Sequence, residues 1–124
     1  MRIFKTGWFV RFSSKEQMMN TVLKDAVNQL EAGHFGADLG GGVYKQRVAR
    51  PGAGKSGGYR VIICFRQGTR AFFVYGFSKS ARENITSGEK RAFKEMAKEL
   101  FSLTDQALNE AVTSGLFEEI ESED

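Results

Sequence analysis

The chain has little of the residue types that staple small secreted domains or hold metal ions. Its 124 residues include one cysteine, one histidine and one proline. A single cysteine excludes an internal disulfide, so the fold does not depend on an oxidising compartment, and we expect a cytoplasmic protein. Cys64 lies inside a strand pattern and His34 in a separate connector. We therefore expect no cysteine nucleophile, no metal site, which needs several ligands, and no other cofactor.

Long apolar runs are also missing. No run approaches the roughly 18 residues that a membrane-spanning helix needs. Residues 1–11 lack the apolar core and the small-residue cleavage site of a signal peptide. We expect no membrane partner. A hydrophobic fraction of 41% and a charged fraction of 27% are typical of one soluble domain with a modest core.

Acidic residues are absent from the centre of the chain. Residues 40–82 contain neither aspartate nor glutamate, yet they hold nine of the 18 lysines and arginines. The rest of the chain has nine basic and 15 acidic residues, a net charge of −6. Ordinary solvated surfaces mix both signs. A one-signed segment beside aromatic strand patterns instead indicates a polyanionic partner such as a nucleic acid.

Periodic apolar residues predict helices on both sides of this basic segment. Apolar residues every three or four positions predict an amphipathic helix over residues 14–32, preceded by a short helix that carries Phe12. A capping box of Ser13 and Glu16 would begin the longer helix, and Gly33 would end it. The later helical patterns are residues 87–103, after a capping box of Thr86 and Glu89, and residues from Thr104 to near Gly115.

The basic segment itself predicts strands. Residues 43–48, 59–66 and 70–77 alternate as strands, with a tight turn at Gly68. Because side chains alternate along a strand, one register brings Lys45, Arg47 and Arg60 together on an open face. The opposite face of the second strand is the better candidate for packing against helices; it carries Tyr59, Val61, Ile63 and Phe65.

These elements predict an α+β fold in which N-terminal helices pack on a small antiparallel β-meander sheet with a C-terminal helix. We expect one domain over residues 1–114 and an acidic, mobile tail over residues 115–124. A solvated, frayed end is the favoured interpretation of the tail. The alternative is a tail that lies across the basic face and competes with a polyanion.

The loop between the first two strands resembles a phosphate-binding loop at residues 49–56. Such a loop needs a helix N-terminus directly after it, but here Gly57, Gly58 and a strand follow. We therefore do not expect nucleotide hydrolysis. The glycines are better explained by a flexible loop that carries Arg50 and Lys55 to a phosphate backbone.

Several runs resemble one known family, the HigB-type branch of the RelE/ParE toxins of bacterial type II toxin–antitoxin modules. The resemblance covers roughly residues 3–103 and is most specific over residues 39–85. The runs that carry it are Lys45-Gln46-Arg47-Val48-Ala49-Arg50-Pro51-Gly52, Gly54-Lys55-Ser56-Gly57-Gly58-Tyr59-Arg60, Phe65-Arg66, Phe72-Phe73-Val74-Tyr75-Gly76-Phe77-Ser78-Lys79-Ser80 and Arg82-Glu83-Asn84-Ile85.

The resemblance implies a toxin that inhibits translation as an mRNA interferase, a metal-independent endoribonuclease acting on translated mRNA on the ribosome. It implies a helix-turn-helix antitoxin of the HigA type as partner. In this chemistry the ribose 2′-OH attacks the adjacent phosphate, which requires a base, an acid and cations. By position in the family, Lys45 is assigned to proton transfer, and Arg47 and Arg60 to the charge of the transition state. RNA binding is assigned to Arg50, Lys55, Lys79 and Arg82.

Two other functions remain open at this stage. ParE-like relatives inhibit DNA gyrase and cleave nothing, and a non-catalytic RNA-binding module would use the same cations. The chain also departs from RelE, since Ser80 and Thr86 stand where RelE has an arginine and a base-stacking tyrosine. Tyr75 and Tyr59 are the candidates to replace that tyrosine.

Overall fold

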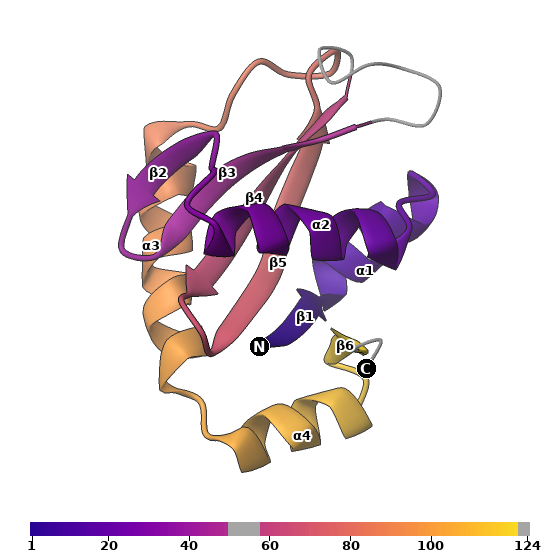
Figure 1. The fold of residues 1–124 in the computed structure, drawn as a ribbon, viewed down its shortest axis with the longest axis vertical. Helices are drawn as coiled ribbons and strands as arrows, with labels where there is room; N and C mark the ends of the chain where they lie inside the picture. Colours follow the sequence, from indigo (N-terminus) through magenta and orange to yellow (C-terminus); the bar gives the residue numbers. More distant parts are fainter. Residues whose placement is uncertain (50–57, 122–124) are drawn as a thin grey trace.

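The computed structural model describes residues 1–49 and 58–121, which form a six-stranded sheet with helices on both faces (Figure 1). The strand order is β2-β3-β4-β5-β1-β6; β1 pairs with β5 in parallel, and every other pair is antiparallel. The predicted α+β class is confirmed. The strands are β1 (Arg2–Thr6), β2 (Ala37–Gly40), β3 (Val43–Val48), β4 (Tyr59–Arg66), β5 (Arg70–Ser78) and β6 (Phe117–Ile120), and the helices are α1 (Gly7–Lys15), α2 (Asn20–Glu31), α3 (Ser87–Ser102) and α4 (Asp105–Thr113).

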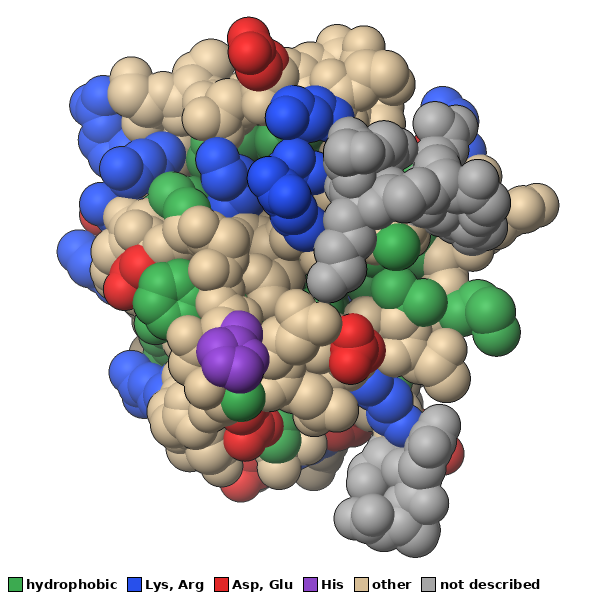
Figure 2. All heavy atoms as spheres, turned by 45° about the horizontal axis from the view of Figure 1, so that its top comes forward, with side chains coloured by type: hydrophobic (Ala, Val, Ile, Leu, Met, Phe, Trp, Pro, Cys, Tyr) green, Lys and Arg blue, Asp and Glu red, His purple; other side chains and the backbone are tan. Residues whose placement is uncertain are grey.

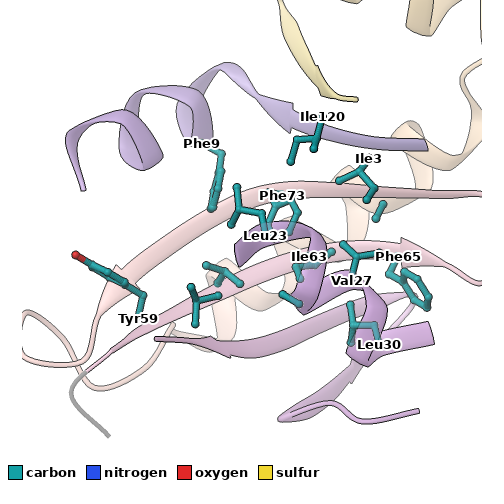
Figure 3. Packing of buried hydrophobic residues seen from close by; sticks show 14 residues of the cluster. Ile3, Phe9, Leu23, Val27, Leu30, Tyr59, Ile63, Phe65, Phe73 and Ile120 are labelled. Atoms are coloured by element: carbon teal, nitrogen blue, oxygen red, sulfur yellow. The ribbon is translucent and has the colours of Figure 1, made fainter. Parts of the chain in front are cut away.

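One face of the sheet packs against the two N-terminal helices. Figure 3 shows this core, with Phe9 of α1 and Leu23 and Val27 of α2 over β4 and β5. Each of these three side chains is completely buried. The prediction for β4 is confirmed, because the residues of that strand in this core are Tyr59, Val61, Ile63 and Phe65.

The other face is covered by α3 and α4, so it is not the open face that alternation predicted. Ile62 and Cys64 of β4 are completely buried there, in a second core that includes Phe93 and Leu100 of α3 and Leu108 of α4. That part of the prediction is wrong because a strand in a sheet covered on both faces is apolar on both sides. Lys45 and Arg47 lie at the end of this face next to Arg60, whereas Arg66 and Arg70 lie at its other end, against Phe101 and Leu103.

The predicted helix over residues 14–32 is two helices, α1 and α2. The backbone N–H of Gln17 donates to Ser14 O, and that of Met18 donates to Ser13 O at 2.8 Å. Gln17 has a φ of 56°, so these bonds form the left-handed cap that ends a helix. The predicted capping box of Ser13 and Glu16 is wrong, because Ser13 lies in the last turn of α1 and its hydroxyl donates to Val10 O.

Other predicted helix boundaries are confirmed. Thr86 and Glu89 form a capping box at the start of α3, in which each side chain accepts a bond from the backbone N–H of the other residue. Gly33 and Gly115 follow α2 and α4 with φ of 84° each, as expected of glycine in the left-handed cap. Gly68 forms the tight turn between β4 and β5 with a φ of 74°.

The predicted mobile tail is wrong for residues 117–120, which form β6 on the edge of the sheet. Ile120 is 4% exposed and pairs with Ile3 of β1. Glu118 forms an ion pair of 2.9 Å with Lys5, and Glu119 accepts two hydrogen bonds of 2.9 Å from Arg2. The acidic residues therefore neutralise the cations of β1, at the edge of the sheet away from β3.

Candidate active site

The basic end of the sheet is built by the pairing of β3 with β4. In the observed register Arg47 lies directly opposite Arg60, and Lys45 lies opposite Ile62, two residues further along β4. The three cations therefore share one face, as predicted. Figure 2 shows Lys and Arg side chains gathered on this part of the surface. They line a cavity of about 310 Å³ whose wall consists of Gly36, Ala37, Lys45, Gln46, Arg47, Arg60, Lys79 and Glu83.

Arg60 is the buried cation of this cavity. Its side chain is only 7% exposed, and no described residue accepts a hydrogen bond from its Nη1 atom. Burial and the neighbouring charge of Arg47 both lower the pKa of the Arg60 guanidinium from its ordinary value. A buried donor without a partner is costly. Arg60 thus offers a buried donor atom, Nη1, that an anion would satisfy.

Lys45 is half-buried beside Arg47 and is held by the segment that follows β5. Its Nζ donates a hydrogen bond of 3.1 Å to Asn84 Oδ1. The same oxygen accepts a bond of 2.9 Å from the backbone N–H of Ile85, which fixes the asparagine side chain. Asn84 therefore orients the ammonium group, and no carboxylate of residues 1–49 and 58–121 forms an ion pair with it.

Arg82 is occupied by bonds within the protein. Its guanidinium donates to both carboxylate oxygens of Glu89 at 3.0 and 2.6 Å, to the hydroxyl of Tyr75 at 3.0 Å and to the backbone oxygen of Asn84. The paired hydrogen bonds raise the pKa of Arg82 and lower that of Glu89 to about 2. Arg82 does not line the cavity. It ties the segment that carries Asn84 to the start of α3.

The two tyrosines proposed to replace a stacking tyrosine have different surroundings. Tyr59 is 2% exposed in the first core, and its hydroxyl donates to Glu16 at 2.7 Å. Tyr75 is half-buried and lies on the side of the sheet that faces Arg82 and α3. Its ring lies 4.5 Å from that of Trp8, which is 39% exposed. Tyr75 is therefore the one of the two that is partly exposed and contacts Arg82.

The remaining predicted residues divide into two groups. Lys79 is exposed and lines the cavity, together with the three predicted catalytic residues. Arg50 and Lys55 lie outside the residues that the structure describes.

Two residues that were not predicted from the sequence also belong to the site. Glu83 lies in the wall of the cavity, and Asn84 accepts a hydrogen bond from Lys45. Their signal was present in the sequence as a polar run directly after the last basic residue of the segment.

Other kinds of site find little support in the described part of the chain. Residues 1–49 and 58–121 contain no group of three or more His, Cys, Asp or Glu side chains that could hold a metal ion. Burial raises the pKa of the Cys64 thiol to about 12, so it is not a nucleophile at neutral pH. Within the same residues, no helix has the length and apolarity needed to cross a membrane.

Comparison with known proteins agrees with this architecture. A family model described as the RelE toxin of the RelE/RelB toxin–antitoxin system matches residues 1–120, which include every strand and helix of the structure. No curated protein matches the chain. The match reaches beyond the region of resemblance inferred from the sequence and includes β6. The chain therefore belongs to the RelE toxin family: it is the toxin of a toxin–antitoxin module, and its partner is an antitoxin.

Proposed function

We propose that this toxin is a metal-independent endoribonuclease of the HigB type that cuts translated mRNA on the ribosome in the cytoplasm, and that a helix-turn-helix antitoxin of the HigA type silences it. The observation that carries the proposal is the buried Arg60 guanidinium without a described partner, in a cavity shared with Lys45, Arg47 and Lys79. Four cations around one cavity suit a phosphodiester. A surface that only attracts polyanions has no need to bury one of its cations.

The proposed reaction is an internal transfer at phosphorus. The ribose 2′-oxygen loses its proton and forms a bond to the adjacent phosphorus, which passes through a phosphorane with added negative charge. The bond from phosphorus to the 5′-oxygen then breaks, and that oxygen gains a proton. The products are a 2′,3′-cyclic phosphate and a 5′-hydroxyl. The protein must supply cations for the phosphorane and groups for the two proton transfers.

Arg60 and Arg47 are assigned to the phosphorane charge. They face each other across the β3–β4 pair, so the oxygens of one phosphate can accept from both guanidinium groups. Because Arg60 is already desolvated, its charge acts with little screening by water. Removal of one such donor lowers the rate of comparable enzymes by about 100- to 1,000-fold. Lys79, and by position Arg50 and Lys55, bind the flanking RNA backbone.

Proton transfer is assigned to Lys45, with Glu83 as the second candidate. Lys45 is held by Asn84, and Glu83 is the one carboxylate among the described residues of the cavity wall. The pH dependence of cleavage separates them. If Glu83→Gln abolishes the acidic limb of the rate profile and Lys45→Met does not change the profile, the carboxylate is the base. If only Lys45→Met changes the profile, the lysine assignment stands.

Arg82 is assigned to positioning, not to direct contact with RNA. Its bonds to Glu89, Tyr75 and Asn84 hold the residue that orients Lys45. We expect Arg82→Lys, which cannot make the same paired bonds, to lower kcat with little change in KM. A higher KM without loss of kcat would instead indicate that Arg82 binds RNA directly.

The proposal is tested by inducing the chain alone in a bacterial host and mapping the 5′ ends of cellular mRNA. The variants are Arg60→Ala and the matched control Arg66→Ala, which removes an exposed arginine at the opposite end of β4. We expect new cuts inside translated frames with the unmodified toxin and with Arg66→Ala, and none with Arg60→Ala. Toxin stripped of divalent metal ions by EDTA and then dialysed should cut ribosome-bound mRNA as fast as untreated toxin.

Three outcomes would contradict the proposal. Growth arrest with broken chromosomes and no new mRNA ends would indicate gyrase inhibition instead. Cuts that persist with Arg60→Ala would show that the basic cavity is not the active site. RNA binding by the purified protein without cleavage of mRNA on the ribosome would indicate a binding module.

A further inference from the structure

A second and larger cavity adjoins the basic one. It has a volume of about 540 Å³ and lies between α2 and β3. Gly36, Gln46 and Arg47 line both cavities, so the two spaces meet at the edge of β3. The edge is accessible here because β2 pairs with β3 only as far as Lys45. The volume is within the range of about 300–1,000 Å³ of small-molecule sites.

The wall between the two cavities is rigid. Gln46 is 3% exposed, and its amide nitrogen donates to Gln29 Oε1 at 3.3 Å and to His34 O at 3.0 Å. Its amide oxygen accepts a bond of 2.8 Å from the backbone N–H of Gly36. Gln46 is thus bonded to Gln29 of α2 and to both His34 and Gly36 of the connector between α2 and β2, and it fixes that connector against β3. A ligand would meet a preformed pocket.

The lining of the larger cavity suits a neutral, flat group. Val22 and Ala26 of α2 and Val48 of β3 supply apolar walls, and Phe35, which is 46% exposed, supplies an aromatic ring. Asp25 also lines the cavity and repels a phosphate. Its Oδ2 accepts a bond from Gln29, and its Oδ1 has no partner among the described residues. That oxygen can accept from an exocyclic amine.

The geometry points to the larger cavity as the pocket for the nucleobase of a nucleotide that flanks the phosphate bound by Arg60. This inference rests on the proposed ribonuclease function. Arg47 lines both spaces and links phosphate to base, while the carboxylate of Asp25 favours bases that donate N–H groups: guanine, adenine or cytosine. Single-stranded RNA is commonly recognised in this way, by splayed bases that stack on aromatic side chains and bond at their edges.

The test combines a substitution that fills the larger cavity with an mRNA that lacks the base at one nucleotide. Val22→Trp fills the cavity from the rim of α2, where Val22 is 36% exposed. Asn28→Trp is the matched control, because Asn28 is exposed on the same helix and lines neither cavity. The substrates are mRNAs bound to ribosomes, either intact or abasic at the nucleotide on one side of the cut. Thermal unfolding checks that each variant is folded.

We expect Val22→Trp to cut intact mRNA about tenfold more slowly, because it loses the contact with one base. Asn28→Trp should cut at the rate of the unmodified toxin. An abasic nucleotide on one side should slow the unmodified toxin by the same factor, and Val22→Trp should not slow it further. Asp25→Asn should weaken any preference for guanine at that position.

Three results would overturn the inference. One is an equal slowing of Val22→Trp on intact and abasic RNA, and another is an unmodified toxin that is indifferent to both abasic positions. The third is a Val22→Trp toxin that cuts normally but escapes its antitoxin, which would assign the cavity to that protein. If the unmodified toxin does not cut at all, the ribonuclease proposal itself fails, and the two failures remain distinct.

Discussion

Replacing Arg60 by methionine should make the protein more stable while removing its activity. Methionine keeps a long unbranched stem in the buried position but has no charge and no donor. Arg60 Nη1 is buried without a described partner, and leaving such a donor unsatisfied costs about 1–3 kcal/mol. Arg47 carries the same charge directly opposite on β3, and this repulsion destabilises the fold by at most about 1 kcal/mol.

The volume lost in the substitution offsets part of this gain, so we expect a net increase of about 1–2 kcal/mol in the free energy of unfolding. For a chain of this size the corresponding rise in Tm is roughly 3 to 10 °C. The assay is thermal unfolding at pH 7 in a buffer without phosphate or sulfate. Arg91→Met is the control, because it removes the same group from an exposed position of α3 and should change stability by less than about 0.5 kcal/mol.

Inorganic phosphate provides the second arm of the assay. Phosphate that binds Arg60 stabilises the unmodified protein by mass action, by about 2.7 kcal/mol at 100 times its Kd. It should stabilise Arg60→Met much less, so the difference in Tm should shrink or reverse as phosphate is added. A loss of stability in Arg60→Met without phosphate would refute the reasoning, since it would mean that Arg60 is a satisfied structural residue.

Three further predictions concern the rest of the molecule. Because burial raises the pKa of Cys64 to about 12, the thiol should not react with Ellman's reagent at pH 8 until urea unfolds the protein; labelling of the native state would contradict its burial. The hydrogen bonds from Arg82 lower the pKa of Glu89 to about 2. The contribution of the pair to stability is therefore complete above about pH 4.5 and is lost as the pH falls to about 2. The stability difference between the unmodified protein and Glu89→Gln should therefore be constant near pH 7 and vanish near pH 2, and a constant difference across that range would contradict the pairing. Deleting residues 117–124 removes β6 and leaves the buried Lys5 without its carboxylate, which should lower the free energy of unfolding by about 2–5 kcal/mol in urea titrations; an unchanged midpoint would show that β6 does not contribute to the core.

Much of the sheet could be predicted because its signals are local. The alternation of β4 placed Tyr59, Val61, Ile63 and Phe65 on the face that α1 and α2 cover. The same period of two brought Lys45, Arg47 and Arg60 to one face, as the register later showed. The capping box of Thr86 and Glu89 was predictable because both partners lie within one helical turn.

The errors arose where a local pattern had a non-local or unusual cause. The break between α1 and α2 depends on Gln17 in the left-handed conformation, a position where glycine is the usual signal. Residues 117–120 look like a solvated acidic end because their partners are far away in the sequence. Their charges are matched by Arg2 and Lys5 of β1. A pattern within a short stretch of sequence cannot indicate a pairing between the two ends of the chain.

Within the site, the sequence identified the cations but not their surroundings. Arg60 and Arg82 look equivalent as members of a basic segment. In the structure Arg60 is buried without a described partner for Nη1, whereas Arg82 has a bidentate partner in Glu89. Only the packing of α3 against the sheet separates the two. Glu83 was overlooked for a simpler reason, since it lies one residue beyond the segment that lacks acids.

The pairing of β1 with β6 has a consequence in time. Arg2 and Glu119, which are 117 residues apart in the chain, are joined by two hydrogen bonds. At synthesis rates of about 5–20 residues per second, the two ends of this pair leave the peptidyl transferase centre roughly 6 to 23 seconds apart. Until residues 117–120 are made, Lys5 has no Glu118 to pair with and Ile3 is not covered by Ile120. The toxin thus completes its sheet only after residue 120 has been synthesised, and an antitoxin already present has that interval in which to meet the incomplete chain.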